Sequence, residues 1–501
     1  MEEINKAKHN EKLLDFLDHV SMGDLEPDSL TSFLDANESG FIQFLPLIIF
    51  YITSQERGQY KNSLFNEITQ CAQRNDRVLF RLMLLHKNVN CCFCCSEDFK
   101  KYSEKRVSSL GLKTSNSFEC GLVSLISTLS DKSQKVEEMT TKLTQILLWF
   151  SSLYLSPDVL LVPPLELDIS DYFFGKGKLI KICPVKRYTS TLRPIQLEFH
   201  FFDDKTQSVH KFNYLYKEGD DLRTDTAAQL SFTVFNAIWS SHTLFKSSEH
   251  AHIYPIAATY QVIPFNNSGL IEIRGNPDTF VNCETHKNST ACIDGRELEM
   301  LYGLHCETCA SKVNISLWSL SKKEKIIETL AGGFVALKLT KRFVGGYIIG
   351  LRDRHLENMK FEIDNGTFFQ IDFGYLLNRR PHFDANRFAV PNCVRNELKK
   401  FTVSIGEEMN GWDAFVKTSC EGFIVLRRKV GMILRIINLS FLFDQEFNEE
   451  SVSDCIAKAF LLGKSEETAA NSLIENLQSF SVQKMIKDRQ HEILRWWRNA
   501  N

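Results

Sequence analysis

Residues 350–361 read GLRDRHLENMKF, and a second stretch, QIDFGYLLNRRP, follows at residues 370–381. The first stretch contains Asp353 and Asn358, and the second contains Asp372. Both stretches lie next to apolar runs that have the spacing of strands or helices. Single charged triplets are common on protein surfaces, but two polar clusters that each end an element indicate a site.

Clusters of this composition suit phosphoryl transfer. Its transition state spreads negative charge over oxygens, so catalysis rests on positioning and charge stabilisation. Magnesium takes oxygen ligands, usually a carboxylate, an amide oxygen and the phosphates, and Asn358 with Asp372 supplies such a pair. A lysine on a strand should then bind the phosphates. Lys217, in YLYKEGDDLRTD (214–225), lies at the end of a strand-like run and before a helical one.

The composition is that of a soluble globular protein. The chain has 501 residues, which favours two or three domains, with 43% hydrophobic and 24% charged residues. The net charge of -3 gives no global basic field, so we expect no nucleic-acid partner. The 14 cysteines are few for this length and the first residues are polar, which predicts a reduced, cytoplasmic protein. The longest apolar run, 41–52, is shorter than the ~20 residues of a membrane-spanning helix.

Helical and strand-like patterns occupy different parts of the chain. Apolar residues recur at helical spacing from about residue 12 to residue 157, and two adjacent prolines then mark a boundary. Strand-like runs follow at 179–185, 194–202, 210–217, 260–265 and 270–274, with one helix at 226–239. Helices dominate again from residue 326, apart from a strand pair at 361–373 whose Asn365-Gly366 predicts a hairpin turn.

These patterns predict an α+β protein with two lobes, one rich in strands and one helical. Four segments follow from them: a helical accessory domain at 1–157, a small lobe at 158–274, a linker or insertion at 275–325, and a large lobe with a C-terminal amphipathic helix at 326–501.

Three motifs of this chain resemble those of the phosphatidylinositol 3-/4-kinase superfamily. That family carries a D-R-H-x-x-N catalytic loop, a D-F-G metal motif and a K-x-G-D-D-L-R-Q-D segment. Here the catalytic loop stands at 353–358, the D-F-G motif at 372–374 and the lysine segment at 217–225. Along the chain the lysine segment comes first, then the catalytic loop and then D-F-G, which is the order of the family. The resemblance covers about 160–501 and implies a protein-kinase-like catalytic domain, while residues 41–85 resemble the end of the family's helical accessory domain.

The resemblance implies roles in ATP binding. Lys217 is expected to bind the α- and β-phosphates, and Asp225 is expected to orient Lys217. Four further residues are expected around the nucleotide: Ser190 in the phosphate-covering turn, Tyr260 at the back of the pocket, and Glu272 and Arg274 at the hinge, where backbone groups meet adenine.

The resemblance also implies the catalytic and metal-binding residues. Asp353, Arg354 and His355 form the catalytic motif, in which the first and third residues handle the inositol hydroxyl. Histidine has the side-chain pKa nearest neutral pH, so His355 suits a general base. Asn358 and Asp372 are expected to hold Mg²⁺ or Mn²⁺.

The segment after D-F-G and the last helical run concern the lipid. The segment GYLLNRRPHFDANRFAVPNCV contains Arg379, Arg380 and Arg387 but no lysine cluster, which suits a lightly charged head group, phosphatidylinositol itself. Trp496 and Trp497 belong to a basic amphipathic run that suits a membrane interface. Both features most resemble the class III branch of the family, which acts in vesicle sorting.

We therefore expect transfer of the ATP γ-phosphate to the 3-hydroxyl of phosphatidylinositol, on endosomal or vesicular membranes in trafficking or autophagy. The alternatives are a phosphatidylinositol 4-kinase, whose loops overlap heavily with these, a protein kinase of the same superfamily, and a catalytically inactive membrane adaptor. Gln370 departs from the family, which usually has histidine there. The resemblance implies a pseudokinase-like regulatory subunit as a partner. The family usually contacts this subunit through an amino-terminal β-sandwich, which we do not expect here, and this puts the partner in doubt.

Overall fold

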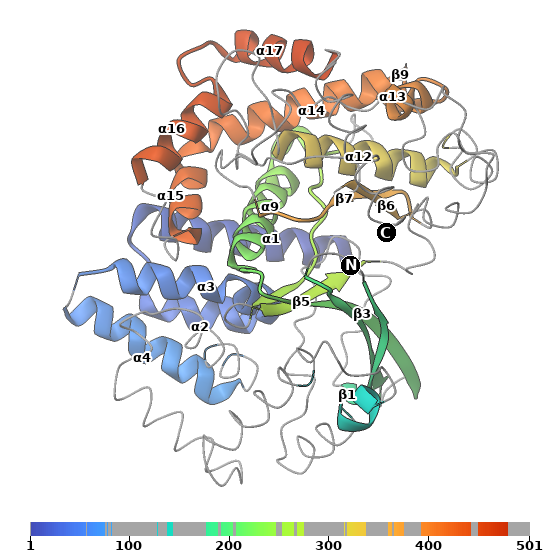
Figure 1. The fold of residues 1–501 in the computed structure, drawn as a ribbon. Coiled ribbons are helices and arrows are strands. Elements are labelled where there is room, and N and C mark those ends of the chain that lie inside the picture. The colour runs from blue at the N-terminus through green and yellow to red at the C-terminus, as the bar shows by residue number, and fades with distance from the viewer. Residues whose placement is uncertain are drawn as a thin grey trace, which may run out of the picture.

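The structure of the chain is a computed structural model, and it describes the following residues: 2–56, 58–75, 78, 82, 128, 138–143, 177–188, 192–203, 207–246, 253–264, 268–274, 315, 318–336, 359–362, 365–374, 392–441 and 449–478. The predicted boundary near residue 157 falls outside these residues and stays a prediction. Within them the protein is a mixed α+β structure with a helical amino-terminal region (Figure 1), which confirms the predicted fold class.

The amino-terminal region contains four helices: α1 (Glu2–Met22), α2 (Pro27–Ala36), α3 (Glu38–Ser54) and α4 (Gln59–Arg74). Pro27 begins α2, where its fixed φ is already helical. The side chain of Asn37 caps α3 by accepting a hydrogen bond of 2.8 Å from Gly40 N. The apolar run 41–52 lies inside α3, and most of its side chains are buried. No helix among the described residues is long and apolar enough to cross a bilayer.

A five-stranded antiparallel sheet follows, in the order β1-β2-β3-β5-β4. Its strands are β1 (Gly177–Arg187), β2 (Ile195–Asp203), β3 (Ser208–Glu218), β4 (Val262–Pro264) and β5 (Ser268–Ile273), which confirms the strand-like runs of the sequence. Lys217 on β3 pairs with Gly269 on β5. A Cβ at Gly269 would collide with the Ile263 carbonyl oxygen, so only glycine fits between these strands. The small lobe is this sheet together with the helix that follows β3.

That helix, α9 (Arg223–Ser241), is buried on all sides. Every residue from Ala227 to Trp239 is buried, as expected of a helix that other elements surround. Its polar side chains hold the extended segment 253–261: Asn236 exchanges two 2.8 Å hydrogen bonds with the backbone of Ala257, and Gln229 Oε1 accepts one of 2.9 Å from Tyr260 N. The short helix α10 (Thr243–Lys246) follows α9.

The large lobe is the set of elements from α12 onward. It contains two hairpins and six helices within the described residues: α12 (Leu320–Ala336), β6 (Met359–Glu362), β7 (Thr367–Gln370), α13 (Asn392–Leu398), β8 (Thr402–Ile405), β9 (Glu407–Asn410), α14 (Gly411–Arg428), α15 (Val430–Ser440), α16 (Glu449–Phe460) and α17 (Glu466–Gln478). The hairpin β6–β7 turns at Asn365-Gly366, as predicted. The hairpin β8–β9 was not predicted, because its four-residue strands have no Asn-Gly pair between them to mark the turn, unlike those of β6–β7.

The amino-terminal helices pack directly on the two lobes. In Figure 1, α1 passes beside α9 and α15, and α3 also contacts α15. Gln43 on α3 donates a hydrogen bond of 3.2 Å to Thr233 on α9. One continuous buried core includes residues of α1, α3, α9, α12, α14 and α15. The described helical region and the two lobes therefore share a core.

Candidate active site

Lys217 lies at the end of β3, where the chain turns toward α9. Its Nζ is 2.9 Å from Asp220 Oδ2, and its side chain is 17% exposed. Gly219, between them, has φ +77°, a left-handed conformation that glycine adopts without strain. The turn brings Asp220 back onto the lysine. The sequence motif contains Asp220 but indicated no role for it, although its position three residues after the lysine was the available signal.

Asp225 lies in the first turn of α9 and is 3% exposed. Its Oδ1 accepts a hydrogen bond of 3.4 Å from Phe373 N, in the segment that follows β7. The predicted task of Asp225 was to orient Lys217. The structure places its carboxyl close enough to act on Lys217 electrostatically, while the direct ion pair of Lys217 goes to Asp220. Asp225 therefore connects the lysine of the small lobe with the D-F-G segment.

Asp372 and Phe373 are neighbours in the chain but differ in exposure. Phe373 is fully buried and packs edge-on against Phe232 at 5.6 Å and tilted against Tyr260 at 6.2 Å. Asp372 is exposed and has φ +63°, which is uncommon for a residue other than glycine. The buried ring anchors the segment in the core and leaves the carboxylate of Asp372 accessible.

The three carboxylates and the lysine form one charge cluster, which consists of Lys217, Asp220, Asp225 and Asp372. Burial lowers the pKa of Lys217, but the carboxylates of Asp225, Asp372 and Asp220 outweigh it, so this pKa lies above its ordinary value. Burial raises the pKa of Asp225 to about 7, because Lys217 only partly offsets the desolvation and the other two carboxylates add to it. The cluster has more negative than positive groups and therefore suits an added cation.

One member of this cluster, Asp372, suits a divalent metal ion, while no three potential ligand side chains come together at one point among the described residues. Carboxylate oxygens are preferred ligands of such an ion, and Asp372 offers an exposed carboxylate beside an excess of negative charge. The second predicted ligand, Asn358, lies outside the described residues. Of the two predicted metal ligands, the structure therefore describes only Asp372, which lies at the edge of the cluster that contains Lys217.

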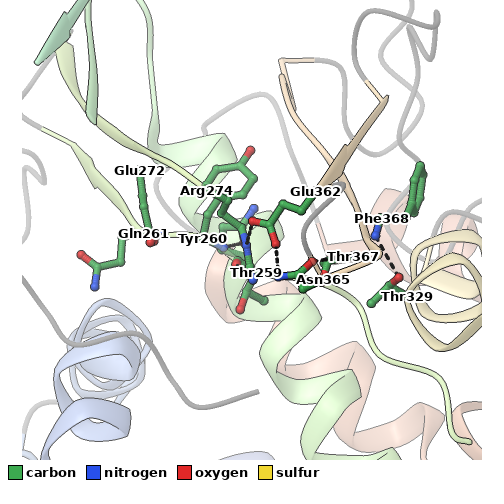
Figure 2. A network of polar contacts seen from close by, with 11 residues as sticks. Thr259, Tyr260, Gln261, Glu272, Arg274, Thr329, Glu362, Asn365, Thr367 and Phe368 are labelled. Carbon is green, nitrogen blue, oxygen red and sulfur yellow. Dashed lines mark hydrogen bonds and ion pairs between the residues drawn. The ribbon is translucent and has the colours of Figure 1, made fainter. Parts of the chain in front are cut away.

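The two residues predicted at the hinge, Glu272 and Arg274, make side-chain contacts within the protein. Glu272 is buried; its Oε2 accepts a hydrogen bond of 2.8 Å from Gln261 N. Burial raises the pKa of Glu272, and Arg274 partly offsets this. Arg274 donates hydrogen bonds to Thr259 O at 2.6 Å and to Glu362 Oε1 at 3.1 Å, and Figure 2 shows these three residues together. The sequence predicted only backbone contacts here, because no local pattern signals a partner on β6.

Ten predicted residues lie outside the described part of the chain and stay predictions: Ser190, Asp353, Arg354, His355, Asn358, Arg379, Arg380, Arg387, Trp496 and Trp497.

Gln370 ends β7 and is 4% exposed. Its side-chain amide has no hydrogen-bond partner within the part of the chain that the structure describes. Gln370 thus places a buried amide two residues before Asp372, where the family usually has histidine.

The fold and the site define a two-lobed kinase-like catalytic domain. A strand of the small lobe carries the lysine, a helix carries the buried carboxylate, and a hairpin of the large lobe leads into the exposed carboxylate. Comparison with known proteins agrees: residues 211–447 match the family model described as phosphatidylinositol 3- and 4-kinase. Over these residues the chain is therefore similar to this superfamily, whose kinases use ATP and a divalent metal ion.

Several curated relatives are phosphatidylinositol 3-kinases by name. VPS34 of Saccharomyces cerevisiae is 24% identical over 388 residues, which cover 75% of this chain and 39% of the relative. The corresponding enzyme pik3 of Schizosaccharomyces pombe is 26% identical, covering 67% and 38%. Phosphatidylinositol 3-kinase 2 of Dictyostelium discoideum is 22% identical, covering 62% and 15%. The chain spans about two fifths of the length of the two yeast relatives.

Proposed function

We propose that this chain is an ATP- and magnesium-dependent phosphatidylinositol 3-kinase that acts on phosphatidylinositol itself. The observation that carries the proposal is the charge cluster, in which Lys217, Asp225 and the segment of Asp372 meet from three separate elements. Support for the 3-hydroxyl comes from the names of the relatives and from the segment after D-F-G, which lacks a lysine cluster.

In this proposal Lys217 binds the phosphates of ATP, and Asp225 holds the lysine and the D-F-G segment in fixed positions relative to each other. Asp372 and Asn358 hold Mg²⁺, which neutralises phosphate charge when it is bound. His355 takes the proton of the inositol hydroxyl, and Asp353 positions that hydroxyl. The hydroxyl oxygen forms a bond to the γ-phosphorus as the bond to the β,γ-bridging oxygen breaks, so ADP leaves.

The membrane-facing part of the proposal rests on sequence. Arg379, Arg380 and Arg387 meet the phosphate of the lipid head group, and Trp496 and Trp497 enter the membrane interface. The proposed place of action is the surface of endosomal or vesicular membranes, where phosphatidylinositol 3-phosphate serves trafficking.

The test is a lipid-kinase assay with separation of the products. Purified chain is incubated with labelled ATP, magnesium and phosphatidylinositol liposomes, alongside Asp372→Ala. We expect a 3-phosphate product from the unaltered chain and a loss of turnover of at least about 100-fold from the variant, because a metal ligand is gone. Glu408→Ala removes an exposed carboxylate on β9 and serves as the control.

Other outcomes discriminate between the alternatives. A 4-phosphate product would keep the mechanism and assign the chain to the 4-kinase branch. Full activity of Asp372→Ala would overturn the metal assignment. Binding of ATP without any lipid product, from a folded chain, would favour the inactive adaptor.

A further inference from the structure

Arg274 and Glu362 form a buried ion pair between the two lobes. Arg274 follows β5, the last described strand of the small lobe, and Glu362 ends β6 in the large lobe. Arg274 Nε lies 3.1 Å from Glu362 Oε1, and the two side chains are 13% and 4% exposed. The described chain next continues at residues 315 and 318, before α12, so this pair connects the lobes through space. Figure 2 shows the two side chains turned toward each other.

The hairpin end of this ion pair is tightly constrained. The second oxygen of Glu362 accepts a hydrogen bond of 2.6 Å from Asn365 Nδ2 in the hairpin turn. Asn365 Oδ1 in turn accepts one of 2.9 Å from Thr367 N, at the start of β7. The next residue, Phe368, donates its backbone N–H to Thr329 on α12 at 2.9 Å. A fixed Glu362 therefore fixes the start of β7, the strand that leads into Asp372.

The small-lobe end is constrained as well. Arg274 also donates a hydrogen bond of 2.6 Å to Thr259 O. Thr259 belongs to the segment 253–261, which Asn236 and Gln229 of α9 hold through its backbone. The guanidinium group thus joins the segment bound to α9 to the hairpin of the large lobe. A single planar group with two fixed partners allows little relative movement between them.

We propose that the Arg274–Glu362 ion pair is a latch between the lobes that sets the position of Asp372 relative to Lys217. Arg274 and Glu362 are positioning residues: they hold the hairpin that presents the metal-binding carboxylate and touch neither lipid nor phosphate. This inference rests on the proposed function of Asp372 as a metal ligand. It predicts that breaking the latch weakens the contribution of the metal ion to nucleotide binding before it weakens nucleotide binding itself.

The test measures the affinity of the full chain for a fluorescent ATP analogue, in excess Mg²⁺ and in EDTA. For Glu362→Gln we expect the affinity in EDTA to stay within about twofold, while the gain from Mg²⁺ falls by roughly tenfold, because misplacement of about 1 Å at a reacting centre has effects of this order or larger. Amide hydrogen exchange at residues 359–370 should become about tenfold faster in the same variant.

Two further variants separate positioning from stability. Glu362→Gln removes the ion-pair partner of buried Arg274 and leaves Glu272 as its remaining neighbouring carboxyl group, which destabilises the fold by itself. The double variant Arg274→Met with Glu362→Leu removes both charges and should regain part of the thermal stability, since Glu272 then lacks Arg274. It should still lack the increase in nucleotide affinity that Mg²⁺ gives the unaltered chain. Arg428→Gln with Glu466→Gln removes an exposed ion pair of 2.8 Å. It should change neither thermal stability nor the effect of Mg²⁺ on nucleotide affinity.

The outcomes distinguish failure of the latch from failure of the proposed function. Suppose that Mg²⁺ no longer increases nucleotide affinity in Asp372→Ala but still does so in Glu362→Gln. This outcome would overturn the latch alone. If Mg²⁺ again increases nucleotide affinity in the double variant, the ion pair is merely structural, and the latch is overturned as well. If the unaltered chain shows no gain from Mg²⁺, the metal assignment fails, and the latch fails with it.

Discussion

Asp225 illustrates how the surroundings of a single carboxyl group set its charge. It lies beside Lys217, which favours its ionised form, but it is withdrawn from water and shares the site with the carboxylates of Asp220 and Asp372. Burial is the largest of these effects, and one ammonium group cannot satisfy three carboxylates. The pKa of Asp225 therefore rises to about 7, so that its charge changes within the physiological range.

We predict that Asp225→Asn changes the pH dependence of stability. A folded-state pKa raised from 3.8 to about 7 means that the native state binds more protons than the unfolded state between these values. The free energy of unfolding of the unaltered protein should therefore fall as pH rises through this window, by up to about 1.4 kcal/mol per pH unit from this group. The variant lacks this contribution.

Denaturant unfolding at pH 5, 6, 7 and 8 checks this prediction. The variant should gain stability over the unaltered protein as the pH increases from 5 toward 7, and the gain should then level off. Glu408→Gln, which neutralises an exposed carboxylate, is the control. A stability difference for Asp225→Asn that is constant across the four pH values would contradict the prediction.

At the scale of the element, the turn of the β6–β7 hairpin depends on one glycine. Gly366 has φ +80°, and a Cβ at this position would lie 2.6 Å from the carbonyl oxygen of Lys322 in α12. The strain of the left-handed backbone and the close contact act together. We predict that Gly366→Ala lowers the free energy of unfolding by about 1–3 kcal/mol, measured by denaturant titration.

A second glycine provides the matched control. Gly431 lies in α15 and is exposed, and a Cβ added to it would have no neighbouring atom within 4 Å among the described residues. Gly431→Ala should raise stability by about 0.5 kcal/mol, because alanine favours the helix. Equal effects of the two substitutions would contradict the role of the hairpin turn.

The sequence predicted the elements of the small lobe and three members of the charge cluster, each for a local reason. Alternating apolar residues identified the strands, and the motif around Lys217 also contained Asp225. The contact between Arg274 and Glu362 joins residues 88 apart, and neither residue belongs to a motif. Such a contact arises only when the lobes pack together. The same holds for Trp239, whose Nε1 donates to the Gly422 carbonyl oxygen on α14 at 2.9 Å.

At the scale of the whole molecule, the amino-terminal helices and the catalytic lobes behave as one folding unit in our interpretation. The sequence predicts a helical accessory domain at 1–157, and this boundary stays a prediction. The buried cluster among the described residues continues from Leu13 on α1 to Leu477 on α17, whereas independently folding domains have cores of their own. The helices α1–α4 and the two lobes should therefore unfold together on heating, in a single cooperative transition.

We predict that Leu17→Ala, on α1, lowers the free energy of unfolding by about 2–5 kcal/mol, because Leu17 is fully buried where α1 packs against the lobes. The loss should shift the transition of the entire protein, observed through tryptophan fluorescence, rather than create an early separate phase. Asp15→Ala, at an exposed position of the same helix, should leave the transition within about 0.5 kcal/mol. An early phase limited to far-ultraviolet circular dichroism would show an independent helical domain.

The burial of α9 on every side has a consequence for synthesis on the ribosome. α1, which covers one face of α9, leaves the exit tunnel before it, but α14 and α15, which cover others, follow only when residues 411–440 have been made. During that interval the nascent chain carries an apolar helix without its partners. Chaperones that bind apolar segments therefore have their best opportunity on this protein between the emergence of α9 and that of α15.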